Sequence, residues 1–376
     1  MEIILNKEDF SNGIKIVEKI TSQKATQPIL SNILIESVSS DRVKFCAADS
    51  NLTLAINYKT SAQVQTAGAI TLSAKKISEI VSKLSSTEVT LKTQEDSENI
   101  KIKSGKTEFE LIGLSASEFP KVLEEVDTPD TKTFILNKNE FSKAIKQVIF
   151  AVSLQETQPV LTGVCFNIEN NILELAATDG NRLTRIQKEI DTPSEELINF
   201  IVPAKTLAEV QRISSIVEDE NIILKIQKNK IIFEFENLAF QSRLIDGIYP
   251  KYQQLIPNSN ERKIVIDRAE LINSIERVSV MVNDRTNIMR FNFTQGQLEI
   301  MADTPEAGKS KDYINIEYDF DDLLTAFNYK FVLDGLKNMD SKNVEIEISN
   351  VLAASIFKPQ DDKNNYICLI MPVKVQ

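Results

Sequence analysis

The stretch Ile3-Ile4-Leu5-Asn6-Lys7-Glu8-Asp9-Phe10 decides the fold, because the chain contains it three times. It returns as Phe134-Ile135-Leu136-Asn137-Lys138-Asn139-Glu140-Phe141 and as Ile264-Val265-Ile266-Asp267-Arg268-Ala269-Glu270-Leu271. In each copy an apolar run typical of a strand ends at Asn or Asp, a residue that caps the N-terminus of a helix. The caps Asn6, Asn137 and Asp267 are 131 and 130 residues apart. This constant spacing predicts an internal repeat.

A helix is predicted after each copy, because apolar residues recur there at i, i+4, i+7 and i+11. That spacing places the four residues on one face of a helix. A second helix is expected later in each repeat, and Ser73 is the expected cap of the first of these. The four-residue faces are Phe10/Ile14/Val17/Thr21, Phe141/Ile145/Val148/Val152 and Leu271/Ile275/Val278/Val282. The six predicted helices span 7–20, 73–84, 137–153, 203–216, 267–282 and 328–339.

Three domains follow from the repeat, over residues 1–126, 127–257 and 258–376. A chain of 376 residues is long enough for three cores of this size. Between the helices, alternating apolar and polar residues predict short strands, the last of them including 351–357 and 365–371. The pattern indicates an α+β fold in which each domain carries two helices on antiparallel sheets.

Composition excludes several classes of protein. The chain has no run of 18 apolar residues, which argues against a transmembrane helix, and its first residues lack the features of a signal peptide. A cytoplasmic protein that does not bind membranes is therefore expected. Histidine is absent, and the cysteines Cys46, Cys165 and Cys368 form no CxxC pair. We therefore expect buried free thiols, no zinc site, no cofactor and no His-dependent catalysis.

Charge is distributed unevenly between the predicted helices and the rest of the chain. The net charge is −11, yet the six predicted helices together carry +5, so the remainder carries −16. If the helices share one surface, that surface is positive on an acidic body and suits phosphate contacts that do not read bases. A merely solvated helix face is the alternative interpretation. The basic residues predicted to face nucleic acid are Lys75, Lys76, Lys143, Lys146, Lys205 and Arg212.

Several stretches resemble one family over the whole chain. They are Leu161-Thr162-Gly163-Val164, Ala177-Thr178-Asp179-Gly180-Asn181-Arg182-Leu183, Leu244-Ile245-Asp246-Gly247-Ile248-Tyr249-Pro250 and Leu369-Ile370-Met371-Pro372-Val373-Lys374. Together with the three repeats, they make the chain similar to the bacterial sliding clamp, the beta subunit of DNA polymerase III. The resemblance implies a head-to-tail homodimer that closes as a ring around double-stranded DNA without reading its sequence. It also implies a processivity factor for DNA replication with no catalytic activity.

The resemblance also implies an interface between the two copies of the chain. The matching positions are Phe109 and Leu111 in the first domain and Val280 and Met281 in the third, all apolar. Lys24 and Gln155 match loop positions that contact duplex DNA in the family. The helix after Asp267 carries a net charge of −1, so it is expected to contribute less to DNA contact and more to ring closure.

A pocket for a short peptide motif is the family's second feature. Through this pocket, the resemblance implies, the chain binds its partners: the DNA polymerase III alpha subunit, the clamp loader, other polymerases and repair proteins. Asn181, Gln254 and Thr286 stand where the best-known clamp has His, Arg and Phe, which affects peptide preference. Residue by residue, the pocket corresponds to Leu161, Thr178, Gly180, Asn181, Arg182, Leu183, Pro250, Gln254, Leu255, Asn328, Phe331, Val351, Leu369, Ile370, Met371, Pro372, Val373 and Lys374.

Two other functions compete with this interpretation. The acidic runs 218–220 and 319–322 are candidate divalent-cation ligands of an enzyme, although loop carboxylates are the simpler explanation. The chain has no Walker-type loop and no GxSxG motif, so no catalytic motif supports that class. A β-rich scaffold that binds peptides but not DNA is the third possibility, and the basic helices argue against it.

Overall fold

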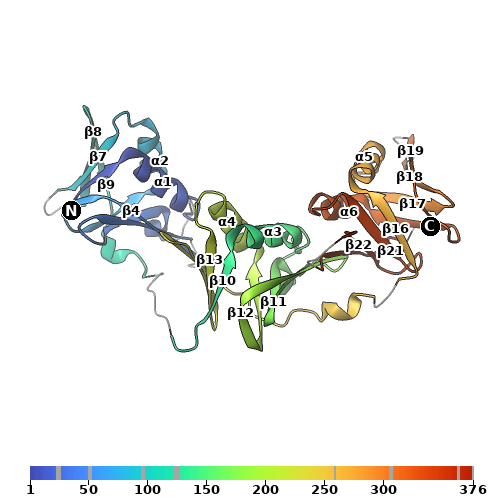
Figure 1. Cartoon of the computed structure of the whole chain (residues 1–376). Helices are drawn as coiled ribbons and strands as arrows, with labels where there is room; N and C mark the ends of the chain where they lie inside the picture. Colours follow the sequence, from blue (N-terminus) through green and yellow to red (C-terminus); the bar gives the residue numbers. More distant parts are fainter. Residues whose placement is uncertain are drawn as a thin grey trace. The chain divides into compact units, whose positions relative to one another are not determined.

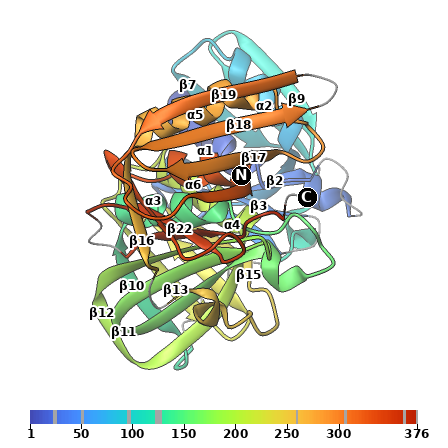
Figure 2. The same cartoon turned by 90° about the vertical axis from the view of Figure 1, so that its right-hand side faces the viewer.

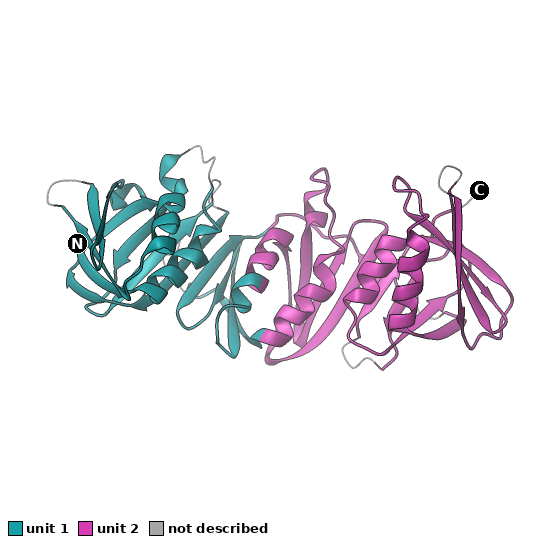
Figure 3. Cartoon of the chain, turned by 90° about the horizontal axis from the view of Figure 1, so that it is seen from above, with its two compact units in different colours: residues 1–138, 212–244 teal, residues 139–211, 245–376 magenta. Residues whose placement is uncertain are grey.

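The computed structural model describes residues 1–22, 27–49, 53–94, 98–121, 128–257, 260–304, 308–361 and 365–374 (Figure 1). The chain forms two compact units. Unit 1 consists of residues 1–138 and 212–244, and unit 2 consists of residues 139–211 and 245–376 (Figure 3).

Unit 1 contains the whole first repeat and part of the second. Its elements are β1 (Glu2–Asn6), α1 (Lys7–Glu18), β2 (Asn32–Ser37), β3 (Arg42–Ala48), β4 (Leu54–Ser61), β5 (Gln63–Thr66), β6 (Ala69–Ser73), α2 (Ala74–Lys83), β7 (Glu88–Thr93), β8 (Asn99–Ser104), β9 (Thr107–Ile112), β10 (Lys132–Asn137), β13 (Asn221–Gln227), β14 (Lys230–Glu234) and β15 (Leu238–Arg243).

Unit 2 contains the rest of the second repeat and the whole third repeat. Two helices cross the division between the units, α3 at its first residue and α4 near its end. The elements are α3 (Lys138–Ile149), β11 (Gly163–Thr178), β12 (Arg182–Pro203), α4 (Ala204–Ser214), η4 (Tyr252–Leu255), β16 (Arg262–Asp267), α5 (Arg268–Ser279), β17 (Ile288–Thr294), β18 (Gln297–Thr304), β19 (Gly308–Asn315), β20 (Leu323–Asn328), α6 (Tyr329–Lys337), β21 (Asn343–Ile348), β22 (Ser355–Pro359) and β23 (Ile367–Ile370).

All six predicted helices are present in the described residues, each shorter than predicted. Asn6 caps α1, since its side-chain oxygen accepts from the amide of Glu8 at 2.8 Å. Asp267 caps α5 in the same way through the amide of Glu270 at 2.9 Å. The predicted Ser73 cap is wrong: its side chain makes no capping hydrogen bond to α2. Sequence reasoning also missed Asn328, whose side-chain oxygen caps α6 by accepting from the amide of Lys330.

Within the described residues every strand pairing is antiparallel, as predicted, and two of the sheets extend from one repeat into the next. Unit 1 has sheets in the orders β5-β1-β7-β8-β9 and β10-β13-β14-β15-β4-β3-β2-β6. In the second of these, β15 of the second repeat pairs with β4 of the first, with Phe240 opposite Ile56. Unit 2 has sheets in the orders β11-β12-β23-β22-β21-β16 and β19-β18-β17-β20. There β12 of the second repeat pairs with β23 of the third, with Leu183 opposite Leu369.

This strand pairing explains why the two units do not coincide with the predicted domains. Each sheet that crosses a repeat boundary joins half of the second repeat to a neighbour, so the most compact division passes through that repeat. The predicted boundaries at 126/127 and 257/258 lie at residues outside the described ranges or beside them. They remain predictions.

Some strand limits differ from the sequence prediction. β5, β6, β19 and β20 were not expected, and the strand predicted over 351–357 begins only at Ser355. Asn350 is the reason, because its side-chain oxygen accepts from the amides of Leu352 and Ala353, both at 3.0 Å, and holds a turn there. A short polar side chain that binds nearby amides competes with strand pairing in this way.

The core is apolar, and the three cysteines are buried and free, as predicted. Burial raises the pKa of Cys46 and of Cys368 to about 12 and that of Cys165 to about 11. Among the described helices, none has the length and hydropathy needed to cross a membrane.

Replacing Asn6 with Ala should destabilise the first repeat by about 1 kcal/mol, the usual effect of losing a cap. Ser73→Ala is the matched control at the start of α2, where no capping bond is lost, and should change stability by less than about 0.5 kcal/mol. Urea unfolding of both variants measures the difference. Equal shifts would show that the Asn6 contact contributes nothing.

Candidate functional site

The turn between β11 and β12 brings together several of the predicted pocket residues. It consists of Asp179, Gly180 and Asn181, and Gly180 has a φ of +89°, which favours glycine. The Thr178 hydroxyl donates to the carbonyl of Arg182 at 2.6 Å and accepts from the Gly180 amide at 3.1 Å. Asp179 accepts from the amides of Asn181 and Arg182. These bonds form a tight turn between β11 and β12.

Arg182 connects this turn to two helical regions of unit 2. Its side chain is only 10% exposed, and its guanidinium donates to Asp179 at 3.0 Å and to Asp334 of α6 at 2.7 Å. A third bond, of 2.6 Å, reaches the carbonyl of Phe150 just after α3. The guanidinium also lies 4.3 Å from the centre of the Phe331 ring. These contacts fix one side of the candidate pocket, because a planar guanidinium binds several acceptors in set directions.

A buried apolar cluster lies beside the turn. Leu183 on β12 and Leu369 on β23 face each other through strand pairing, and Leu161 joins them from the segment before β11. Tyr249 and Tyr252 also belong to the cluster. Both lie in residues 244–257, the connector that follows β15. The predicted residues Leu161, Leu183 and Leu369 are therefore brought together, from parts of the chain up to about two hundred residues apart.

Exposed apolar side chains adjoin this cluster along the chain. Leu255 of the connector is 57% exposed, and Met371 after β23 is 42% exposed. Val351 is exposed in the turn before β22, close in sequence to Ala354, which packs against the cluster. Ile248, which lies beside Tyr249 and is 90% exposed, was not among the predicted pocket residues.

The chain end runs alongside this site. The amide of Met371 donates to the carbonyl of Asn181 at 2.9 Å, and the amide of Val373 donates to the carbonyl of Ala326 at 2.8 Å. Ile370 is buried, while Pro372 is half-buried and Lys374 is exposed. Of the other predicted pocket residues, Pro250 and Gln254 are exposed, whereas the Asn328 side chain is engaged in capping α6.

This arrangement can bind a short peptide. Buried leucines supply an apolar floor, exposed apolar side chains supply walls, and the turn and chain end supply polar backbone groups. All of the residues involved belong to unit 2.

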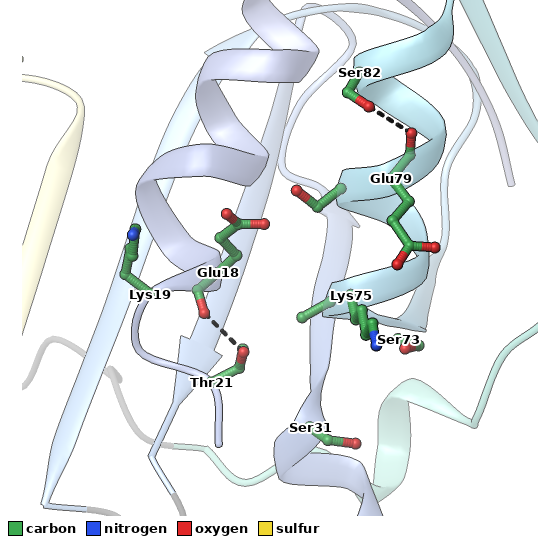
Figure 4. Close-up of a pocket in the computed structure, with 10 residues that line it drawn as sticks. Glu18, Lys19, Thr21, Ser31, Ser73, Lys75, Glu79 and Ser82 are labelled. Atoms are coloured by element: carbon green, nitrogen blue, oxygen red, sulfur yellow. Dashed lines mark hydrogen bonds between the residues drawn. The ribbon is translucent and has the colours of Figure 1, made fainter. Parts of the chain in front are cut away.

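The face formed by α1 and α2 in unit 1 has a different chemistry. A cavity of about 810 Å³ lies between the two helices, and Lys19 and Lys75 are at its edge (Figure 4). Hydroxyl groups line it, among them those of Thr21 and Ser73, with the carboxylates of Glu18 and Glu79. Lysines and hydroxyls are donors that suit phosphate oxygens, without base recognition.

The other predicted DNA-facing residues differ in their surroundings. Lys76, Lys146, Lys205 and Gln155 are exposed. Lys143 pairs with Asp340 at 2.5 Å, and this hydrogen bond lowers the pKa of the Asp340 carboxyl.

The Arg212 guanidinium donates to the carbonyl of Ile16 in α1 at 3.0 Å, so part of its role is structural. Lys24 lies outside the described residues.

β9 and β19 are two of the partly apolar strands that end the sheets within the described residues, and each has a neighbouring strand on one side only. β9 is the last strand of the five-stranded sheet, and its Phe109 and Leu111 are half-buried. β19 is the last strand of the four-stranded sheet of unit 2 (Figure 2). Near it, Val280 at the end of α5 is 77% exposed and Met281 is half-buried. The predicted interface residues thus lie on or near free edges, which invite strand pairing with another chain.

The acidic runs have partners or neighbours that fit loop carboxylates. Asp219 accepts from the amide of Glu236 at 2.6 Å. Asp319, Asp321 and Asp322 share a cavity with the cationic Arg262. No cluster of three or more potential metal ligands occurs within the described residues.

Comparisons with known proteins cover the whole chain. Models for the N-terminal, central and C-terminal domains of the DNA polymerase III beta subunit match residues 1–123, 135–251 and 253–374. The beta sliding clamp of Synechocystis sp. is 31% identical, with all of both chains covered.

Solved structures of DNA polymerase III beta subunits are also similar to this chain over its whole length. The putative DNA polymerase III beta subunit of Eubacterium rectale has a TM-score of 0.92 and 31% identity over all of both chains. The sliding clamp of Bartonella birtlesii bound to griselimycin has a TM-score of 0.92 and 28% identity, also over all of both chains.

Replacing Arg182 with Lys should destabilise unit 2 by about 2 kcal/mol, because one ammonium cannot satisfy all three acceptors of the buried guanidinium. Arg277→Lys is the matched control in the same unit, since Arg277 is an exposed residue paired with Asp312. It should change stability by less than about 0.5 kcal/mol. Urea unfolding compares the two, and similar midpoints would refute the structural role of Arg182.

Proposed function

The chain belongs to the family of the DNA polymerase III beta subunit, the beta sliding clamps, and from this we propose how its own residues carry out that function. It is a DNA sliding clamp, a non-catalytic processivity factor of DNA replication. Two copies join head to tail and close a ring around duplex DNA, in the cytoplasm. Encirclement then replaces tight binding, which is why a chain with a net charge of −11 can hold DNA.

The free edges of β9 and β19 support this way of closing the ring. β9 carries Glu108 and Glu110 between its apolar residues. β19 carries Lys309 and Lys311, and its Asp312 pairs with Arg277. Both lysine side chains are more than half exposed, although each also pairs with a carboxylate of its own chain. Opposite charges on two edges favour pairing of β9 from one copy with β19 from the other. Phe109 and Leu111 would then be buried against Val280 and Met281.

The helices provide the surface that faces DNA. Lys75 is exposed in unit 1, and Lys146 and Lys205 are exposed in unit 2. In unit 1 the cavity between α1 and α2 adds hydroxyl donors. Such contacts are weak and sensitive to salt, so the ring can slide. Lys24, Lys76, Lys143, Gln155 and Arg212 complete the proposed set.

The candidate pocket of unit 2 binds the linear motif of the partner proteins. Its buried Leu161, Leu183 and Leu369 accept apolar anchors, and Arg182 fixes the adjoining turn. The partners are the polymerase alpha subunit, the clamp loader, and other polymerases and repair proteins. Griselimycin is bound to the Bartonella birtlesii clamp. We propose that it also binds this chain, at the candidate pocket.

The double substitution Val280→Asp and Met281→Asp should convert the dimer to a monomer, because it would bury two charges without partners. Light scattering should then give a mass near 42.3 kDa rather than twice that value. Leu324→Asp is the control. Leu324 is exposed on β20, at the edge of the four-stranded sheet opposite to β19, so this variant should remain a dimer.

The same proteins test encirclement. The unchanged protein, once loaded, should stay on circular DNA and run off after linearisation, and the monomeric variant should be retained on neither. Equal loss of the unchanged protein from circular and linear DNA would overturn the proposal.

Replacing Lys146 and Lys205 with Ala should weaken binding of linear duplex DNA at low salt. Each lost phosphate contact should also reduce the slope of log K against log salt by about 1. Lys228→Ala with Lys230→Ala removes the same charge from the β13–β14 turn of the same repeat. Fluorescence anisotropy across a salt series compares them. If both pairs had the same effect, only net charge would matter, and the helices would not be the DNA-facing surface.

A further inference from the structure

The connector after β15 forms one wall of the proposed pocket. At its start the Ile245 amide donates to the carbonyl of Ile201 on β12 at 2.9 Å, but the wall residues lie further along it. It supplies Pro250, Gln254 and Leu255, all exposed. The hydrogen bonds of its amides at Tyr252, Gln254 and Ile256 are local, to the carbonyls of residues 250, 251 and 253. Local bonds shape η4 without fixing its place on the sheet.

Two tyrosines attach the connector to the sheet. Tyr249 and Tyr252 are 6% and 2% exposed, and their rings meet edge to face with centroids 6.1 Å apart. Both belong to the same apolar cluster as Leu161, Leu183 and Leu369. The floor of the proposed pocket and the attachment of its wall are therefore parts of one packed group.

The tyrosine hydroxyls bind β11 at two points. The hydroxyl of Tyr249 accepts from the Thr178 amide at 3.0 Å, next to the turn that Arg182 stabilises. The hydroxyl of Tyr252 donates to the Glu174 carboxylate and accepts from the Asn167 side-chain amide at 2.8 Å. Burial raises the pKa of Tyr252, and the Glu174 hydrogen bond raises it further, so this hydroxyl keeps its proton and remains a donor.

Glu174 is itself held by a polar network on the sheet. Its carboxylate accepts from the side-chain amide of Gln187 on β12 at 2.8 Å and from that of Asn167 on β11 at 3.2 Å. The Arg185 guanidinium lies 3.9 Å from the same carboxylate. An acceptor fixed from two strands defines one position for the Tyr252 hydroxyl, since moving it would leave buried polar groups unpaired.

We propose that Tyr252 and Glu174 are positioning residues for the peptide pocket, which set the place of the wall formed by Pro250, Gln254 and Leu255 before a ligand arrives. This inference rests on the proposed pocket. A wall held in its bound position spares the ligand the cost of ordering it, so the contact contributes to affinity although neither side chain needs to touch the ligand.

Griselimycin binding tests the proposal, measured by calorimetry on the full-length protein. Tyr252→Phe removes only the hydroxyl and should weaken binding by roughly fivefold to tenfold, the equivalent of one hydrogen bond. Glu174→Ala should have a similar effect. The double variant should lose no more than Glu174→Ala alone, because that change already removes the Tyr252–Glu174 hydrogen bond with the other bonds of the carboxylate.

Tyr318→Phe is the matched control for general destabilisation. Tyr318 is 4% exposed, and its hydroxyl donates to the carbonyl of Asp321 at 2.7 Å, within the third repeat and outside the pocket residues. It should leave griselimycin affinity unchanged. In the unliganded protein, hydrogen exchange at the amides of Gln254 and Ile256 should become faster in Tyr252→Phe but not in Tyr318→Phe.

The outcomes separate this inference from the proposed function. If the unchanged protein did not bind griselimycin, the pocket assignment would fail and the inference with it. If it bound, but Tyr252→Phe bound equally well or Tyr318→Phe lost as much, the positioning role alone would be overturned.

Discussion

Strand pairing between repeats is the constraint on which the rest of the structure depends. A repeat that ended in its own sheet would leave open edges, and the chain instead pairs β15 with β4 and β12 with β23. Each pairing buries polar backbone groups of two repeats at once and turns separate sheets into one. The compact units therefore divide within the second repeat, although the sequence repeats in three.

The proposed peptide pocket is a product of the β12–β23 pairing. Leu183 and Leu369 come from different repeats and meet only because their strands are neighbours in one sheet. Arg182, the first residue of β12, then reaches Asp334 on α6. The connector must cross the same region, and its tyrosines attach it there. The region around the β12–β23 strand pair thus supplies the floor, one side and one wall of the site.

Two edge strands that are unpaired in one copy of the chain suit pairing with a second copy. Within the described residues, β9 and β19 end their sheets with no neighbouring strand, and they carry charges of opposite sign. A second copy of the chain can satisfy both edges, as the proposed ring requires. Net charge is also divided: the six predicted helices carry +5 and the rest of the chain carries −16. Weak phosphate contacts from the helix lysines would permit sliding.

The sequence by itself determined the repeat, the six helices and the caps Asn6 and Asp267, because helix periodicity and capping depend on neighbours a few residues apart. The resemblance of short stretches supplied the pocket residues, and the structure brings Leu161, Leu183 and Leu369 together. Only the tertiary structure decided that Tyr252 meets Glu174 and that Arg212 binds a carbonyl of α1. These contacts join residues through sheet pairing and side-chain geometry, which no local pattern in the chain encodes.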